Sequence, residues 1–257
     1  ASIKSNFLTY LFTLTRLEAE SVFLSLAGYK YMEQSLAARS QKATIDSYEI
    51  PIFVITISTF QATNILIAKS LGANRQSEVG KAILVSCMLG MALTIPIATT
   101  LFFLRDSLFN PTVAEFFEYF IWSMPFLAIN SVNSQAILGL QKYTASAVIG
   151  SLRAALIYIL AYCLSESYQE KGLPLALSLS NVVFALATTA YLFNLTSKDD
   201  VYNLKKLPTK SELIKESKAL IKVGAPLCLK ELGGQLYSIF AFVKILQSLD
   251  LEDKIIA

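Results

Sequence analysis

The stretch KAILVSCMLGMALTIPIATTLFFL, residues 81–104, decides the class of this protein. A helix needs about 20 mostly apolar residues to cross the hydrocarbon core of a bilayer. After Lys81 the stretch carries no charged residue, and membrane helices tolerate a break such as Pro96 better than soluble helices do. We therefore interpret residues 81–104 as a membrane-spanning helix.

The composition of the whole chain agrees with this interpretation. Of the 257 residues, 54% are hydrophobic and 16% are charged, and the mean hydropathy is +0.52, whereas a soluble domain carries about a quarter charged residues. A net charge of +3, with dispersed basic residues, does not indicate nucleic-acid binding. The chain has no histidine, and its three cysteines are far apart in apolar stretches. We therefore expect no catalytic residues, no protein-held metal cluster and no cofactor.

Further apolar runs of spanning length recur along the chain. Alternating apolar runs and short polar loops predict an all-α polytopic membrane protein. The seven predicted spans cover residues 5–28, 49–70, 81–104, 115–140, 143–165, 173–196 and 218–248.

The charges between these spans predict the direction in which the chain crosses the membrane. If the spans alternate, Lys and Arg gather on one side, at residues 69–81, 142 and 197–218. On the other side, acids outnumber basic residues in 105–118 and 165–172. Because an excess of Lys and Arg marks cytoplasmic loops, we expect a multi-pass protein of the cell membrane with its amino terminus in the cytoplasm.

A Lys-rich segment, residues 197–217, is the one plausible linker. It separates residues 1–196, expected to form a six-helix bundle, from residues 218–257, expected to be the first helix of a second bundle. The first and seventh spans both carry charges in their early halves, a weak internal repeat of the kind found in transporters built from repeated halves. The chain ends abruptly at SLDLEDKIIA, so we expect that it is incomplete.

Several segments resemble the multidrug and toxic compound extrusion (MATE) family. Residues 50–83, IPIFVITISTFQATNILIAKSLGANRQSEVGKAI, resemble its second span and following loop, with a proline opening the helix and a basic loop closing it. Residues 122–151, WSMPFLAINSVNSQAILGLQKYTASAVIGS, are similar to its fourth and fifth spans. KGLPLALSLSNVVFALATTAYLF, at 171–193, resembles its sixth span, and IKVGAPLCLKEL, at 221–232, the start of its second half. The resemblance covers nearly the whole chain, as one half plus one helix.

This resemblance implies a twelve-helix antiporter with a central cavity between two six-helix bundles. Such a protein exports organic, often cationic, compounds in exchange for H⁺ or Na⁺ by alternating access, and the resemblance implies a monomer completed by a second half. Two alternatives stay open. One is a lipid-linked oligosaccharide flippase of the same superfamily, and the other is a membrane scaffold that does not transport.

The sequence departs from the family at the usual coupling acids. Members often carry an Asp late in the first span, where this chain reads FLSLAGYK. Many carry a Glu about two turns after the proline of the seventh span, where this chain has Gly233 and Gly234, so that Glu231 is the nearest acid. An Asn/Asp pair in the fifth span of some members is absent, and Arg153 and Tyr158 are found there instead.

Charges inside the first span are candidates for ion coupling. Arg16 and Glu20 are four residues apart and can pair on one helix face. Glu18 has no charged neighbour on its own helix, and Arg153 lies alone in the fifth span. Because a buried charge requires a partner, we expect Glu18 or Glu20 to pair with Arg153, and either acid to exchange H⁺ or hold Na⁺. The alternative is a static polar cluster that fixes helix packing.

Uncharged polar residues inside the spans are candidates for the lining of a substrate cavity. Hydrogen bonds between membrane helices are also ordinary packing contacts, and that alternative applies to each residue taken singly. The candidates are Asn64, Asn130, Asn133, Tyr158 and Asn181.

Overall fold

A computed structural model describes residues 60–109, 111–198 and 208–248 of the chain. Within these ranges the secondary structure is helical and contains no strand, which confirms the predicted all-α class. The helices are residues 60–72, α3 (Ser77–Leu108), α4 (Pro111–Phe120), η1 (Ile121–Ser123), α5 (Met124–Gly139), α6 (Tyr143–Tyr168), η2 (Gln169–Lys171), α7 (Gly172–Lys198) and α8 (Lys210–Ser248).

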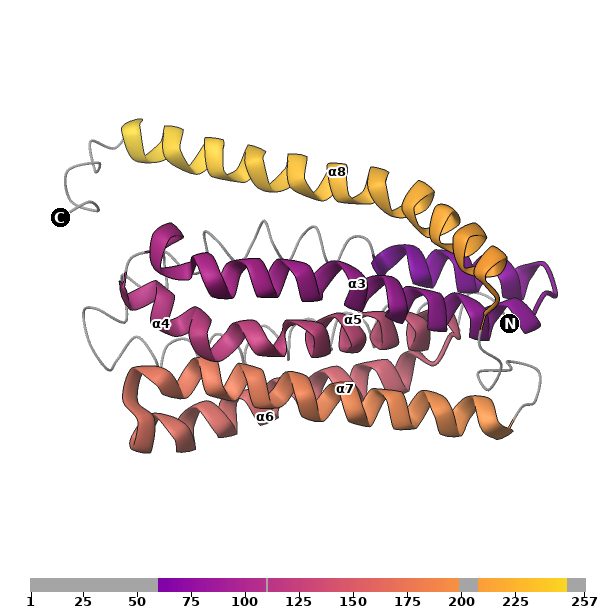
Figure 1. Cartoon of the computed structure of the whole chain (residues 1–257), viewed down its shortest axis with the longest axis horizontal. Coiled ribbons are helices and arrows are strands. Elements are labelled where there is room, and N and C mark those ends of the chain that lie inside the picture. Colours follow the sequence, from indigo (N-terminus) through magenta and orange to yellow (C-terminus); the bar gives the residue numbers. More distant parts are fainter. Residues whose placement is uncertain (1–59, 110, 199–207, 249–257) are drawn as a thin grey trace.

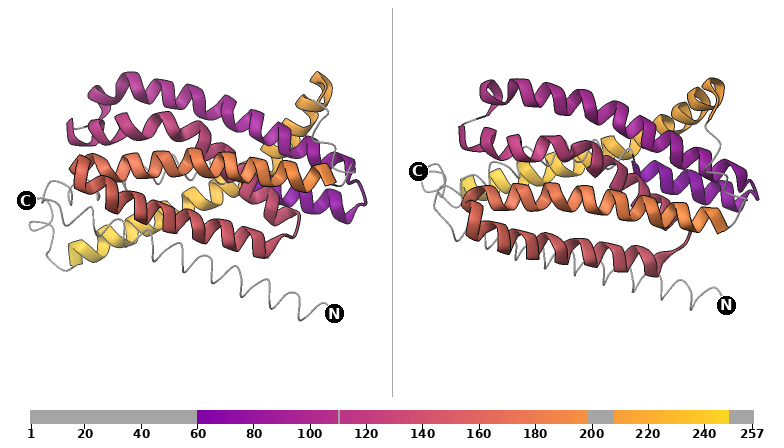
Figure 2. Two further views of the ribbon diagram at one scale, coloured as in Figure 1. Left: turned by 90° about the horizontal axis from the view of Figure 1, so that it is seen from below. Right: turned by 60° about the horizontal axis from the view of Figure 1, so that its bottom comes forward.

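These helices form an elongated bundle, and most of them run along its long axis (Figure 1). Helix α5 packs against both α3 and α7, and α6 packs against α7. Helix α8 contacts α3 and runs obliquely to the bundle (Figure 2). Among the described residues, the buried contacts of α8 lie in its first turns, where Leu220 packs with Ala62 and Val85.

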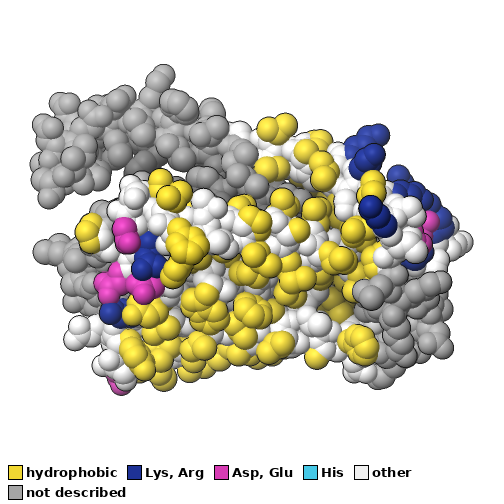
Figure 3. Space-filling model, viewed as in Figure 1, with side chains coloured by type: hydrophobic (Ala, Val, Ile, Leu, Met, Phe, Trp, Pro, Cys, Tyr) yellow, Lys and Arg dark blue, Asp and Glu magenta, His cyan; other side chains and the backbone are white. Residues whose placement is uncertain are grey.

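Three of the described helices are long and apolar enough to cross a membrane, namely Ser77–Leu108, Tyr143–Tyr168 and Gly172–Thr196. They contain the predicted spans 81–104, 143–165 and 173–196. Figure 3 shows hydrophobic side chains over the middle of the molecule and charged side chains at its two ends. This distribution fits a bilayer whose hydrocarbon core surrounds the middle of the bundle.

The predicted fourth span, 115–140, is divided rather than continuous. It consists of α4, the 3₁₀ turn η1 and α5. Pro125 is the second residue of α5, and a proline lacks an N–H group and clashes with the carbonyl four residues earlier. That carbonyl belongs to Ile121, where the 3₁₀ turn begins. The break therefore has a local cause that the sequence contains.

The helix that contains the seventh predicted span, 218–248, begins before that span, because α8 starts at Lys210. Thr209 and Glu212 form a capping box, in which the Thr209 N–H donates to Oε2 of Glu212 at 2.8 Å and the Glu212 N–H donates to Oγ1 of Thr209 at 3.4 Å. Residues 210–217 of the expected linker 197–217 are thus helical. Helix α8 does not reach the apolarity of the three helices above, so its crossing of the membrane stays a prediction.

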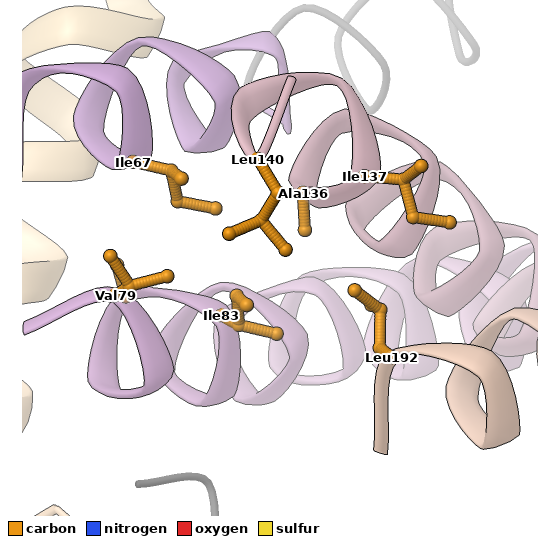
Figure 4. Close-up of a cluster of buried hydrophobic side chains, with 8 residues drawn as sticks. Ile67, Val79, Ile83, Ala136, Ile137, Leu140 and Leu192 are labelled. Carbon is orange, nitrogen blue, oxygen red and sulfur yellow. The ribbon is translucent and has the colours of Figure 1, made fainter. Parts of the chain in front are cut away.

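Apolar side chains fill the space between the helices. One cluster lies where the helix over residues 60–72, α3, α5 and α7 meet (Figure 4). Gly139 allows this close approach, because a Cβ there would lie 2.9 Å from Cβ of Ile67 and 3.1 Å from the carbonyl oxygen of Asn64. The buried members of the cluster are Ile67, Val79, Ala82, Ile83, Ala136, Ile137, Leu140 and Leu192.

Candidate functional site

One buried polar group joins α6, α7 and η1, and we call Arg153, Asn181 and Ser123 the Arg153 cluster. Nη2 of Arg153 donates to Oδ1 of Asn181 at 3.0 Å. Nδ2 of Asn181 donates to Oγ of Ser123 at 3.2 Å. Asn181 and Ser123 are buried, and Arg153 is half-buried. These bonds hold a permanent positive charge between helices of the bundle.

The break before α5 explains the position of Ser123. In the 3₁₀ turn the Met124 N–H bonds to the carbonyl of Ile121, not to that of Phe120 as it would in an α-helix. Ser123 Oγ donates to the Phe120 carbonyl instead, at 2.8 Å. The same hydroxyl accepts the bond from Asn181. The proline-induced break thus supplies the last link of the Arg153 cluster.

A second buried polar group, the Asn133 cluster, joins α3, α5 and α7. Nδ2 of Asn133 donates to Oγ1 of Thr189 at 2.8 Å and to Oγ1 of Thr188 at 3.1 Å. Sγ of Cys87 donates to Oδ1 of Asn133 at 3.8 Å. Asn133 and Thr188 are buried. The side chain of Asn133 therefore joins three helices at one point.

The remaining cavity candidates occupy different surroundings. Asn130, one turn before Asn133, is 3% exposed, and its Oδ1 has no hydrogen-bond partner within the described part of the chain. Asn64 is half-buried and its carbonyl lies against Gly139. Tyr158 is half-buried against the apolar cluster between α6 and α7. Of these, Asn130 is the candidate whose amide has unused hydrogen-bonding capacity among the described residues.

The acidic candidates fall where the structure gives no side-chain detail. Glu18 and Glu20 lie outside the described residues, and so does their possible partner Arg16. Glu231 is on α8, but its side chain lies outside the described part. The expected pairing of Glu18 or Glu20 with Arg153 therefore stays a prediction. Among the residues described, no group of three or more His, Cys, Asp or Glu side chains lies together as a metal site would require.

Sequence reasoning did not identify Ser123, Thr188 and Thr189 as partners of the predicted amides. Ser and Thr residues inside the apolar runs are only a weak signal. Hydroxyl side chains are common in apolar helices, where they donate hydrogen bonds to backbone carbonyls of the same helix. Thr188 does so, donating to the Phe184 carbonyl at 2.6 Å. The structure shows that Thr188 and Thr189 also bind Asn133, because α7 is rotated so that both hydroxyls face α5.

Charged side chains form a link at the end of the bundle where α8 begins. Lys81 at the start of α3 makes an ion pair and hydrogen bond with Glu212 on α8. The hydrogen bond from Lys81, followed by that from the Thr209 backbone, lowers the pKa of Glu212 to about 2.

At the opposite end of the bundle, Lys171 forms an ion pair with Glu115 at 2.7 Å. The hydrogen bond to Glu115, and a weaker one to Tyr119, raise the pKa of Lys171.

An apolar pocket of about 280 Å³ lies beside the break between α4 and α5. Its one hydroxyl, on Thr99, is already donated to the Ile95 carbonyl at 2.8 Å. The pocket thus suits an apolar group better than a charged one. It is lined by Ile95, Ala98, Thr99, Phe102, Ile121, Trp122 and Pro125.

The sequence profile of the MatE family matches residues 22–163, which is more than half of the chain. No curated protein sequence matches the chain.

Solved structures with the same fold are distant in sequence. One is an outward-facing multidrug resistance MATE family transporter of the MOP superfamily, at 18% identity and a TM-score of 0.79, covering 90% of this chain and 53% of that one. Another is MATE in complex with Br-NRF, at 18% identity and a TM-score of 0.82, covering 96% and 59%. A third is a MOP superfamily transporter from Pyrococcus furiosus, at 18% identity and a TM-score of 0.75, covering 90% and 53%. The chain therefore spans between half and two thirds of the length of these structures.

Proposed function

The chain belongs to the MatE family of membrane transporters, and on that premise we propose that it forms the first half of a secondary antiporter. The complete protein would export organic, often cationic, compounds in exchange for H⁺ or Na⁺ by alternating access. It would act as a monomer, with a second six-helix half completing the cavity. Solved structures of the family fold that are nearly twice as long as this chain support the expectation of a second half.

The observation that carries the proposal is the Arg153 cluster. A charged side chain inside a membrane bundle is costly, and it marks ion or substrate pathways in many transporters. Here an amide fixes that charge from the neighbouring helix, at 3.0 Å from Nη2 of Arg153. A positive charge held at one place in the bundle interior can bias an acid on another helix towards its ionised state.

We infer that this acid is Glu18 or Glu20. An acid paired with Arg153 would lose the pairing when it binds a proton, and would need other ligands when it binds Na⁺. Either event would change what the acid and Arg153 contact. Glu231 on α8 is the corresponding candidate in the second half.

We further propose that the buried amides of α5 take part in substrate binding. Asn130 and Asn133 are three residues apart on one face of α5, and both are buried in the bundle. The unused Oδ1 of Asn130 can accept a hydrogen bond from an organic ammonium group. Asn64, Tyr158 and Asn181 complete the set of proposed cavity residues.

Transport by the full-length protein in proteoliposomes tests this function. A fluorescent organic cation is followed while a pH gradient or a Na⁺ gradient is imposed. Glu18→Gln, Glu20→Gln and Arg153→Ala are compared with Lys142→Gln, which removes an exposed charge from a turn. We expect at least one acid variant and Arg153→Ala to lose gradient-driven transport while Lys142→Gln retains it. Unchanged transport in all three would refute the coupling role.

A flippase of the same superfamily is the second candidate, and Arg153 is the observation that favours it. A lipid-linked pyrophosphate needs cations in the cavity, and Arg suits a phosphate group better than Lys does. Export of a fluorescent cation argues for the antiporter. Translocation of a lipid-linked oligosaccharide without any gradient argues for the flippase.

A further inference from the structure

The first turns of α8 present a basic face on the side opposite to the bundle. Lys215, Lys218 and Lys222 are all exposed, and their spacing of three and four residues places them on one side of the helix. We call these three residues the basic stripe. Within the described part of the chain, none of them forms an ion pair with an acid that would neutralise it.

The opposite face of the same turns is fixed to the bundle. Leu220 is 1% exposed and packs with Ala62 and Val85, and Leu213 lies against the same cluster. The ion pair between Lys81 and Glu212 holds the first turn of α8 to α3. Because both contacts fix the rotation of the helix, the basic stripe faces away from the described bundle.

The stripe lies near the depth of the lipid headgroups. Glu212 is level with Lys81, the last charged residue before the apolar run of α3. Figure 3 shows Lys and Arg at this end of the molecule, bordering the hydrophobic surface. Lys side chains just inside that border can extend their ammonium groups outward to the headgroups. The stripe therefore lies at the boundary between water and hydrocarbon.

Two exposed isoleucines flank the stripe along one side. Ile214 is 48% exposed and Ile221 is 52% exposed, seven residues apart and so on one side of α8. A helix face with apolar residues beside Lys residues suits the interface of an anionic bilayer, where the apolar side chains enter the acyl region and the ammonium groups meet phosphates. The acids of these turns, Glu212 and Glu216, lie on the other side, towards Lys81.

We propose that the basic stripe binds the headgroups of anionic phospholipids in the adjacent leaflet. The lipid would hold the start of α8 from outside while Lys81 and Leu220 hold it from the bundle side. Each Lys near an anionic surface strengthens the attraction about fivefold. Lipid binding at the basic stripe depends neither on the transported compound nor on the coupling ion.

Native mass spectrometry of the purified full-length protein tests the proposal. The protein in detergent is titrated with phosphatidylglycerol or with phosphatidylcholine of the same acyl chains. We expect tighter binding of phosphatidylglycerol, and Lys218→Gln/Lys222→Gln should weaken it on the order of 25-fold. Lys69→Gln/Lys142→Gln is the matched control, because it removes two exposed charges from the same end of the molecule and should change binding only slightly.

The outcomes separate lipid binding from a structural role of the stripe. Equal affinity for the two lipids in the unaltered protein would overturn the proposal, as would an equal loss in the control variant. A lower midpoint of thermal unfolding for Lys218→Gln/Lys222→Gln in phosphatidylcholine would also overturn it, because the stripe would then contact protein. A midpoint that rises with phosphatidylglycerol in the unaltered protein, and does not rise in this variant, would support it.

Discussion

Asn133 shows what a single buried amide contributes in an apolar bundle. Its side-chain N–H groups donate hydrogen bonds to the hydroxyls of Thr188 and Thr189 on α7. Its Oδ1 accepts a hydrogen bond from the thiol of Cys87 on α3. Packing and substrate binding are both open roles for this residue. The two roles differ in what a substitution removes, because packing changes stability whereas binding changes affinity.

Asn133→Ala should lower the free energy of unfolding by about 1–2 kcal/mol, because each hydrogen bond between membrane helices contributes roughly 0.6 kcal/mol and up to about 1.7. Loss of the Asn133 amide should affect Thr188 less than Thr189, since the Thr188 hydroxyl also donates a hydrogen bond to the Phe184 carbonyl. Equilibrium unfolding in mixed micelles measures the effect. Asn194→Ala, at an exposed position of α7, should change stability by less than about 0.5 kcal/mol. Equal effects of the two substitutions would show that the Asn133 cluster contributes nothing to packing.

At the scale of elements, Gly139 sets how closely α5 approaches the helix over residues 60–72. An added Cβ would fall 2.9 Å from Cβ of Ile67 and 3.1 Å from the backbone oxygen of Asn64. Neither atom is the end of a flexible side chain, so the two helices must separate. Small residues at helix contacts allow this kind of packing in membranes.

Gly139→Ala should therefore destabilise the bundle by about 1–3 kcal/mol, the usual cost of an overpacked contact. Gly72→Ala is the matched control, because a Cβ at Gly72 would have no heavy atom within 4 Å. The midpoint of thermal unfolding in detergent measures both variants. If Gly72→Ala lowered the midpoint as much as Gly139→Ala, close packing at Gly139 would not be the cause.

The link between α3 and α8 has a pH dependence whose sign follows from Glu212. Its pKa in the folded protein is about 2, below the ordinary value of 4.5. A lowered carboxyl pKa stabilises the folded state fully above the ordinary value, and this contribution disappears as the pH falls towards the folded value. The ion pair with Lys81 should thus hold α8 at neutral pH and weaken in acid.

Glu212→Gln should be less stable than the unaltered protein at pH 7, and the difference should shrink between about pH 4.5 and pH 2. Thermal unfolding midpoints at several pH values measure the difference. Glu166→Gln, at an exposed position near the other end of the bundle, serves as the control. A difference that stayed constant down to pH 2 would assign the effect to something other than ionisation of Glu212.

At the scale of the whole molecule, the charges at the two ends predict its orientation. One end carries Lys69, Lys142 and the basic stripe, and the other carries Glu115 and Lys171 as an ion pair. Because an excess of Lys and Arg marks the cytoplasmic side, we predict that the turn at Lys142 lies inside and the turn at Lys171 lies outside.

Single cysteines in a background without natural cysteines test this orientation. Lys171→Cys should react with a membrane-impermeant maleimide added outside intact cells, and Lys142→Cys should react only after the membrane is opened. Lys142 is exposed, and the side chain of Lys171 is 43% exposed, so accessibility within the fold does not limit the reaction. The reverse pattern would invert the proposed topology.

Three of the predicted spans, the all-α class and the family could be predicted because each rests on local properties. An apolar run of about 20 residues is recognisable wherever it occurs. The predicted spans at 81–104, 143–165 and 173–196 lie within α3, α6 and α7. The break at Pro125 was not predicted, and its form as a 3₁₀ turn with a bonded Ser123 depends on the neighbouring helix α7.

The sequence by itself determined that this is a polytopic membrane protein of the MatE family with one strongly basic end. Only the tertiary structure decided that Arg153 meets Asn181, that Asn133 meets Thr188 and Thr189, and that Lys81 meets Glu212. Hydropathy and charge are properties of consecutive residues, so the sequence alone is enough to calculate them. Contacts between helices depend on how each helix is rotated and how deep it lies, and in this bundle close-packed residues such as Gly139 fix those quantities.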